Sequence, residues 1–256
     1  MRPDLLRPSW EAPPGVAAAM SLRAGGVSTG PYTSFNLGLA VGDDPAAVAA
    51  NRSHWAQALA ARPVWLRQVH GTAVLRLDAQ SPDAPEALAD AAWTTERGIA
   101  CTVQVADCMP VLYALRDGSA VAAAHAGWRG LAGGMLEAAL QALCAGTGAA
   151  PDDVQVWLGP CIGPRQFEVG VDVLEAFGQS AHEADARRFC FRPRADGTPR
   201  WLANLALLAR DQLDAAGVQP ALISAAQACT VEDVSSFFSF RRDGVTGRHA
   251  AAIWRR

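Results

Sequence analysis

Three apolar runs follow one another closely in the middle of the chain, and they limit its fold more than any other feature does. The runs cover residues 99–105, 110–115 and 120–125, and short turns that contain polar or small residues separate them. Runs of this length between turn residues are typical of strands buried in a sheet. Because no helix separates these strands, mixed strand connections fit better than a strict βαβ winding.

Helices and further strands are predicted around this central region. Asp44 and Pro45 suit the N-cap and first turn of a helix over residues 45–61. Two more helices are predicted over residues 131–145, ended by Gly146, and over residues 201–217. Further strands are predicted for VWLRQVHG, AVLRL, DVQVWLG, RFCFRP, SSFFSFRRDG and HAAAIW. The sequence therefore predicts an α/β (α+β) single domain in which helices flank mixed β-sheets.

The length and composition are those of one folded domain. The chain has 256 residues, of which 50% are hydrophobic and 18% charged, so it can bury a large core. No stretch rich in Gly, Ser or Pro is long enough to be an interdomain linker. We expect a partly irregular, Pro-rich N-terminal segment over residues 1–20 and a single catalytic domain over residues 21–256.

Charge and hydropathy argue against several kinds of partner. The net charge is −3, so the chain has no basic excess for binding nucleic acid. It has no uncharged apolar run of about 18 residues, the length of a membrane span, and no secretion signal. We expect a cytoplasmic monomer with reduced cysteines that acts on a small molecule, without a nucleic-acid or membrane partner.

Three apolar runs each lead to a side chain that binds transition metals. His70 follows the run 64–69, Cys108 follows the run 102–106, and His125 ends the run 120–124. Two imidazoles and a thiolate suit zinc, and three protein ligands leave a fourth position open, as metal-assisted hydrolysis requires. Their spacing matches no local zinc-finger pattern. From the residues alone, a core cysteine and ordinary turn histidines remain an open alternative.

A series of motifs extends this interpretation. RAGGVSTGPYTSFNLG, QVHGTAV, ADCMPVLY, HAGWRG, LGPCIGP and FFSFRRDGVTGR occur in this order between Leu22 and Trp254. The series resembles that of the YfiH family of laccase-domain proteins, once called multicopper polyphenol oxidases, some of which are named peptidoglycan editing factors. The resemblance implies a YfiH-like fold, one zinc held by His70, Cys108 and His125, and purine nucleoside phosphorolysis and adenosine deamination. Copper is the alternative ion.

The same motifs supply further candidate residues. The catalytic candidates are Cys108, His125 and Asp107, and Asp107 is expected either to orient a ligating imidazole or to act as a general acid or base. The resemblance favours Arg23 and Arg129 for contacts to phosphate or ribose. Alternatively, Arg129 is a surface residue that covers Trp128.

Two amides and two departures from the family pattern complete the candidate set. The side chains of Asn36 and Gln68 can hydrogen-bond a purine edge or a ribose hydroxyl, although backbone groups often satisfy such amides. Val105 stands where family members often carry Thr, and Phe240 where Tyr is common. We expect these two changes to affect efficiency or substrate preference.

Three other functions fit the same residues. Without a metal, Cys108 and His125 form the nucleophile and base of an amidase that edits peptidoglycan precursors by removing a wrongly incorporated amino acid from UDP-MurNAc. A copper-dependent polyphenol oxidase would need more histidines than the five present. A partner-binding protein whose metal only stabilises the fold is the third alternative. Of the other cysteines, Cys161 is expected to be structural, and Cys101, Cys144 and Cys190 to lie in the core.

Overall fold

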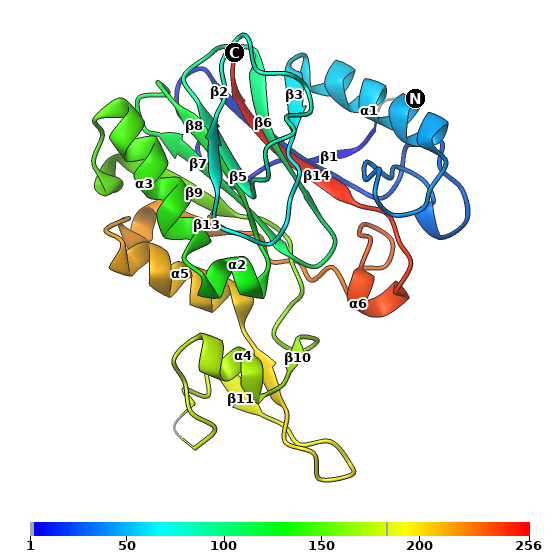
Figure 1. Cartoon of the computed structure of the whole chain (residues 1–256), viewed down its shortest axis with the longest axis vertical. Coiled ribbons are helices and arrows are strands. Elements are labelled where there is room, and N and C mark those ends of the chain that lie inside the picture. Colours follow the sequence, from blue (N-terminus) through cyan, green and yellow to red (C-terminus); the bar gives the residue numbers. More distant parts are fainter. Residues whose placement is uncertain (1–2, 183) are drawn as a thin grey trace.

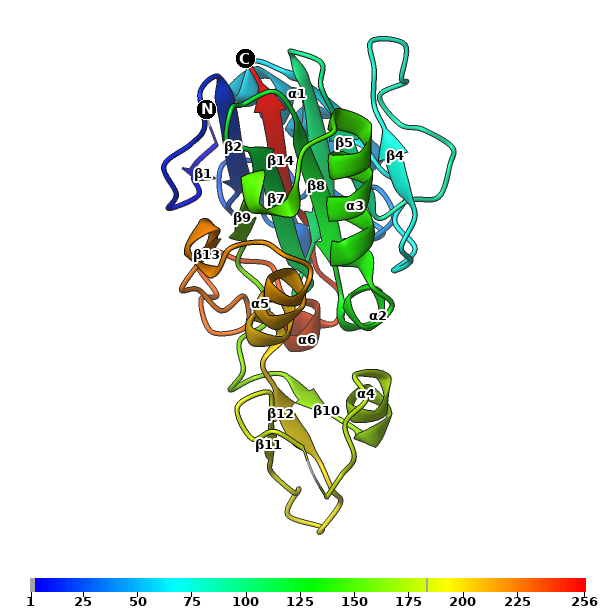
Figure 2. The same ribbon diagram turned by 90° about the vertical axis from the view of Figure 1, so that its left-hand side faces the viewer.

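The computed structural model describes residues 3–182 and 184–256, which form two facing β-sheets with helices on their outer faces (Figures 1 and 2). The five-stranded sheet has the order β1 (Leu5–Leu6), β2 (Val16–Ser21), β14 (His249–Arg255), β6 (Ile99–Val105), β3 (Arg62–Trp65). The six-stranded sheet has the order β13 (Ile223–Ala225), β9 (Val154–Leu158), β7 (Met109–Leu115), β8 (Val121–Ala126), β5 (Ala91–Thr94), β4 (Val74–Arg76). Both sheets mix parallel and antiparallel pairs, so the predicted fold class is confirmed.

Helices cover the outer face of each sheet. Helix α1 (Pro45–Leu59) packs on the five-stranded sheet, and α3 (Met135–Thr147) and α5 (Leu205–Ala215) pack on the side of the six-stranded sheet (Figure 1). The shorter helices are α2 (Trp128–Ala132), α4 (Val171–Ala176) and α6 (Phe240–Asp243). Three 3-10 turns lie at Gly30–Tyr32, Pro151–Asp153 and Pro220–Leu222. No helix among the described residues is long and apolar enough to cross a membrane.

A small third sheet projects from one end of the two-sheet body (Figure 2). It has the order β10 (Glu168–Val169), β12 (Trp201–Ala203), β11 (Phe189–Phe191), and α4 lies beside it. Phe189 and Trp201 of this sheet belong to the same hydrophobic cluster as helix α3. The projection therefore shares the core of the main body.

Strands buried on both faces explain why the sequence shows continuous apolar runs. Along β14, Ala251 and Ile253 point into the layer between the two sheets, whereas Ala252 and Trp254 point toward α1. Side chains alternate between the faces of a strand, so burial of both faces requires apolar residues at every position. The three successive strands predicted over residues 99–125 are confirmed as β6, β7 and β8.

Glycine residues account for one error in the helix predictions. The helix predicted over residues 131–145 is two helices, because Gly133 and Gly134 separate α2 from α3, and Gly134 has a φ of 89°. Helix α3 does not end at Gly146. It ends at Thr147, and Gly148 with a φ of 75° forms its C-cap, as the left-handed conformation favours glycine.

Three other expectations were wrong. The first residues of the helix predicted over 201–217 form β12, and α5 begins only at Leu205. The strand predicted for SSFFSFRRDG is a turn followed by α6, which Ser239 caps by accepting the Arg242 N–H. Cys190 is exposed and not in the core. Residue 20, at which we expect the N-terminal segment to end, lies in β2, which pairs with β1 and β14 in the five-stranded sheet.

Candidate metal and substrate site

The three predicted metal ligands meet where the two sheets come together. His70 lies in the loop after β3, Cys108 in the turn that links β6 to β7, and His125 near the end of β8. One donor atom from each residue lies within 4.8 Å of the other two. The Cys108 Sγ is 3.9 Å from the His70 Nε2, and the two imidazole centroids are 4.7 Å apart. The structure therefore brings together donors that are far apart in the sequence.

Strained backbone at two positions directs these donors. His70 has a φ of 61°, and Asp107, directly before Cys108, has a φ of 85°. Non-glycine residues adopt such angles rarely, and they do so mainly where surrounding contacts impose them at functional sites. The Asp107 carboxylate accepts a hydrogen bond from the Thr230 hydroxyl at 2.5 Å and one from the Arg241 N–H at 2.6 Å. These contacts fix the turn that presents Cys108.

Asp90, which the sequence reasoning missed, organises both histidines. Its fully buried carboxylate accepts hydrogen bonds from the backbone N–H groups of Val69, His70 and Gly71 at 2.8–3.0 Å. It also contacts the His125 Nδ1 at 2.8 Å. Because a carboxylate accepts, His125 donates from Nδ1 and its Nε2 lone pair is free for a metal. The contact that we expected of Asp107, the orientation of a ligating imidazole, is made to His125 by Asp90.

A glycine leaves room for the donors. A Cβ atom added to Gly127 would lie 2.9 Å from the Cys108 Sγ and 3.0 Å from the His70 Cδ2. Real Cβ atoms keep a larger distance from sulfur and ring carbons, so a side chain at this position would push the ligands apart. The Gly of HAGWRG thus has a packing reason, which the sequence alone did not reveal.

The electrostatics of the cluster favour charged ligands. Burial raises the pKa of the Cys108 thiol, but the His125 and His70 imidazoles outweigh this effect and hold the pKa below its usual value. Burial lowers the pKa of His125, but Cys108 and Asp90 outweigh it and raise that pKa. Burial raises the pKa of Asp90, whereas His125 and the backbone N–H groups lower it overall. A thiolate, the His70 imidazole and the His125 imidazole, whose tautomer Asp90 fixes, fit a zinc ion, which takes sulfur and nitrogen donors.

A cavity of about 790 Å³ opens over the cluster. It is in the size range of small-molecule sites, and His70, Cys108 and His125 all contribute to its wall. Leu39 and Phe240 are apolar lining residues whose side chains are 54% and 57% exposed, so they offer free contact area. The cationic lining residues are Arg52, Arg67 and Arg248, and the only carboxylate among the described lining residues is Glu86. The cavity thus combines metal donors, positive charge and apolar surface.

The predicted substrate amides differ in their placement. Gln68 lines the cavity, and its side chain pairs with the backbone of Gln104 through bonds of 2.7 Å and 2.9 Å. Asn36 is fully buried outside the lining and contacts Gly38, Asp43 and the Arg248 N–H. Its predicted substrate contact therefore has no support in the geometry, and it supports Arg248 instead.

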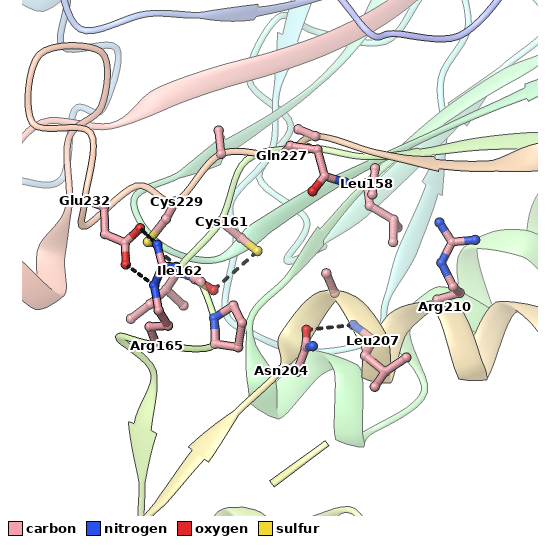
Figure 3. A pocket seen from close by; sticks show the side chains of 17 residues that line it. Leu158, Cys161, Ile162, Arg165, Asn204, Leu207, Arg210, Gln227, Cys229 and Glu232 are labelled. Atoms are coloured by element: carbon pink, nitrogen blue, oxygen red, sulfur yellow. Dashed lines mark hydrogen bonds and ion pairs between the residues drawn. The ribbon is translucent and has the colours of Figure 1, made fainter. Parts of the chain in front are cut away.

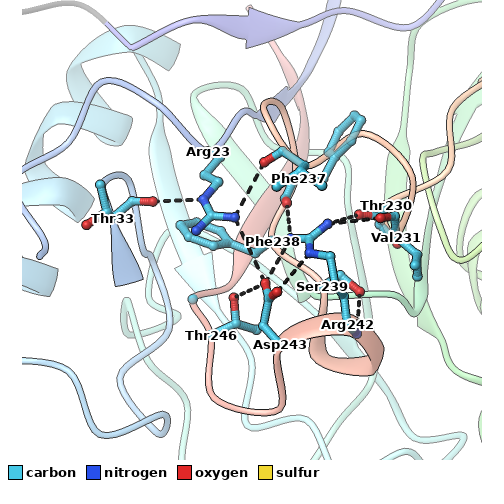
Figure 4. Close-up of polar contacts among 12 residues, drawn as sticks. Arg23, Thr33, Thr230, Val231, Phe237, Phe238, Ser239, Arg242, Asp243 and Thr246 are labelled. Carbon is cyan, nitrogen blue, oxygen red and sulfur yellow. Dashed lines mark hydrogen bonds and ion pairs between the residues drawn. The ribbon is translucent and has the colours of Figure 1, made fainter. Parts of the chain in front are cut away.

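The predicted substrate arginines lie outside the cavity lining. Arg23 donates to the Thr33 carbonyl at 2.9 Å, lies 3.9 Å from the Asp243 carboxylate and stacks over Phe238 (Figure 4). Its contacts brace the segment that leads to α6. Arg129 is exposed on α2 and stacks on Trp128 with its guanidinium 4.3 Å from the ring centroid, as the surface alternative expects. The cations at the cavity, Arg52, Arg67 and Arg248, come from other parts of the chain.

A second cavity of about 460 Å³ lies between the loop after β9 and helix α5 (Figure 3). Cys161 is buried beside it, and burial raises the pKa of its thiol to about 12, in keeping with the expected structural role. The Gly163 N–H donates to the Cys229 Sγ at 3.1 Å. Arg165 and Glu232 pair with each other at 2.7 Å at its rim. The first cavity, which contains the metal donors, is therefore the candidate active site.

Comparisons with known proteins agree with the motifs. The family model described as "Multi-copper polyphenol oxidoreductase laccase" matches residues 17–256. The chain is 45% identical to Purine nucleoside phosphorylase PA4543 of Pseudomonas aeruginosa, with 97% of each chain covered. It is also 45% identical to Purine nucleoside phosphorylase YfiH of Escherichia coli, with 98% of each chain covered.

Solved structures show the same fold. The chain is similar to the protein NMB0706 of Neisseria meningitidis, with a TM-score of 0.86, 42% identity and 98% of each chain covered. It is similar to YlmD of Geobacillus stearothermophilus, with a TM-score of 0.84, 34% identity, and 95% and 93% of the two chains covered. The chain therefore belongs to the YfiH family of laccase-domain proteins.

Proposed function

We propose that this protein is a zinc-dependent purine nucleoside phosphorylase. The observation that carries the proposal is the cluster of His70, Cys108 and His125 at the wall of a cavity of about 790 Å³ that three arginines also line. Relatives named purine nucleoside phosphorylase, aligned over nearly the whole chain, support the same reaction. The substrates are a purine nucleoside such as inosine or adenosine, with methylthioadenosine as a further candidate, and inorganic phosphate.

The reaction assigns clear tasks to the residues of the cavity. A phosphate oxygen forms a bond to C1′ of the ribose while the bond from C1′ to the purine nitrogen breaks, and the purine leaves with a proton. The lining arginines offset the negative charge of phosphate, and Phe240 and Leu39 offer apolar surface for the base and sugar. A bound zinc ion supplies Lewis acidity and a further positive charge. Asp90 binds the His125 Nδ1–H, so the neutral imidazole would present its Nε2 lone pair to that ion.

Adenosine deamination is proposed at the same site. Replacing the amino group at C6 of adenine by oxygen requires an activated water and a proton for the departing ammonia, and a Lewis-acidic zinc supports the first requirement. Asp107 stays a proposed acid or base for the second. The Thr230 hydroxyl and the Arg241 N–H each donate to one of its two oxygens, so this role would use the lone pairs that these contacts leave free.

Product analysis tests both reactions. Purified protein is incubated with inosine or adenosine, with and without phosphate, beside a Cys108→Ala variant. We expect phosphate-dependent release of hypoxanthine and ribose 1-phosphate from inosine, and adenine or inosine from adenosine. Product formation that is no higher than in the Cys108→Ala variant would rule out the nucleoside assignment.

A second function is favoured by one observation. The imidazoles around Cys108 lower the pKa of its thiol, which also suits a nucleophile with His125 as base, in an amidase acting on a peptidoglycan precursor. Metal content separates the two functions. Activity that survives metal removal and is lost on alkylation of Cys108 supports the amidase, whereas activity that needs zinc supports the phosphorylase.

Copper-dependent polyphenol oxidation has less support. Among the described residues, one group of three or more His, Cys, Asp or Glu side chains is placed to bind a metal, and it offers three donors. Several copper ions would need additional imidazoles. We therefore propose one zinc ion, and a monomeric cytoplasmic enzyme with small-molecule substrates remains our expectation.

A further inference from the structure

Arg248 reaches the candidate active site from the end of the chain. Its backbone N–H donates to the Asn36 Oδ1 at 2.8 Å, and its carbonyl accepts from the Leu37 N–H at 3.0 Å. A Cβ on Gly38 would lie 2.6 Å from the Arg248 Cγ, so the absence of a side chain there lets Arg248 pass. The loop around Asn36 therefore positions this arginine, which lines the cavity.

The guanidinium of Arg248 is only partly used by the protein. Its Nη1 donates to the carbonyls of Thr246 and Gly247, both at 3.1 Å. Within the part of the chain that the structure describes, its Nε and Nη2 make no hydrogen bond. Burial lowers the pKa of Arg248, and the negative charges of Cys108 and Asp107 oppose this effect. Two donor nitrogens of Arg248 are thus available at the cavity that the metal donors also line.

Arg52 lines the same cavity in a fixed orientation. Its guanidinium stacks 3.9 Å from the Trp65 ring centroid, its Nε donates to the Leu37 carbonyl at 2.9 Å, and its Nη2 donates to Gln104 at 3.3 Å. Burial lowers the pKa of Arg52 to about 10, which leaves it charged at neutral pH. The Leu37 carbonyl accepts a hydrogen bond from Arg52, and the Leu37 N–H donates one to the Arg248 carbonyl, so one loop positions both arginines.

We infer that Arg248 and Arg52 form the phosphate subsite of the candidate active site, a role expected of Arg23 and Arg129 from the motifs alone. The inference rests on the proposed phosphorolysis. A phosphate dianion has four oxygens for hydrogen bonds, and a guanidinium presents parallel donors to two of them. Arg248, with free donors, contacts the phosphate directly, and Arg52 adds charge from α1 at the same cavity.

Steady-state kinetics and direct binding test this subsite. The variants are Arg248→Gln and Arg248→Lys, with Arg129→Gln as the rival assignment. Arg76→Gln is the matched control. Like Arg129, Arg76 stacks on a tryptophan, with its guanidinium 5.2 Å from the ring centroid of Trp93, and it is exposed and lies outside the cavity lining. Loss of charge-assisted hydrogen bonds predicts that Arg248→Gln raises the KM for phosphate about 10- to 100-fold. The KM for inosine should change less than about threefold.

Phosphate binding without nucleoside provides the second readout. The phosphorus resonance of inorganic phosphate broadens when phosphate binds a protein, and the metal content of each protein is measured alongside. This broadening should decrease in Arg248→Gln and decrease less in Arg248→Lys. It should persist in Arg129→Gln and Arg76→Gln. If wild-type protein binds phosphate through Arg248 but releases no purine, the proposed function fails and the subsite stands. The subsite is overturned if Arg129→Gln, and not Arg248→Gln, weakens phosphate binding or raises the KM for phosphate. It is also overturned if wild-type protein neither binds nor uses phosphate.

Discussion

The substitution Asp90→Asn should damage both folding and metal binding. The native carboxylate serves four donors, namely three consecutive backbone N–H groups and the His125 Nδ1. An asparagine keeps one oxygen, which can serve the His70 N–H and His125. Its amide nitrogen then faces the N–H groups of Val69 and Gly71, which lose their acceptor.

The magnitude follows from these lost contacts. A buried donor left without an acceptor costs about 1–3 kcal/mol, and the Val69 and Gly71 groups are only partly buried, so we take the lower half of that range. Asp90→Asn should therefore reduce the free energy of unfolding by about 2–4 kcal/mol. Loss of a carboxylate behind a ligating histidine should weaken zinc binding by about 10- to 100-fold.

Two assays separate these effects. Urea unfolding in the presence of a chelator measures the stability of the metal-free fold, and competition with a chromogenic chelator measures zinc affinity. The control is Asp214→Asn, since Asp214 is exposed on α5 far from the cluster in sequence, and it should change stability by less than about 0.5 kcal/mol. If Asp90→Asn matches this control in both assays, Asp90 does not organise the site.

Three other substitutions or treatments have defined outcomes. Gly127→Ala should weaken zinc binding at least about tenfold in the competition assay, because its Cβ would meet Cys108 and His70. The control is Gly130→Ala, whose Cβ meets no atom closer than 3.4 Å and which should bind zinc normally. Burial lowers the pKa of His249 to about 3, so His249 takes up a proton on unfolding when the pH is below about 6.5. The free energy of unfolding should therefore fall by up to about 1.4 kcal/mol per pH unit as the pH drops from about 6 to about 4.5. This slope should be smaller in His249→Gln, and an equal slope would show that His249 is not buried in its neutral form. Iodoacetamide followed by mass spectrometry should label exposed Cys190 in the native protein before buried Cys101, whose thiol pKa burial raises, and early labelling of Cys101 would contradict the core packing.

The sequence predicted elements whose local pattern agrees with their burial. Helix α1 begins at Pro45 after the Asp44 cap, as expected, and the apolar runs of β6, β7 and β8 are strands. The segment around Phe238 misled the prediction because its apolar residues are buried as in a strand, while Ser239 caps a short helix immediately afterwards. Short apolar runs do not distinguish these structures by periodicity.

The candidate site was predictable only in part for a related reason. His70, Cys108 and His125 are rare residue types at the ends of apolar runs, so their chemistry is visible in the sequence. Asp90 is one carboxylate at the end of an Ala- and Pro-rich connection, and its role depends on the pairing of β5 with β4 and β8, which places it beneath the His70 loop.

The arginines illustrate the same limit. Arg52 on α1 and Arg248 before β14 lie far apart in the sequence, and the backbone of Leu37 hydrogen-bonds the Arg52 side chain and the Arg248 carbonyl. Pairing of β14 with β2 and β6 creates this arrangement. Contacts between distant parts of the chain have no local signature, so the motifs pointed to Arg23 and Arg129 instead.

Metal analysis of protein purified without added metals tests the central claim most directly. The convergence of His70, Cys108 and His125 predicts about one zinc ion per chain in the wild-type protein, and a loss of most of that zinc in both Cys108→Ala and His70→Ala. Two or more copper ions per chain, or a zinc content that neither substitution changes, would contradict the account.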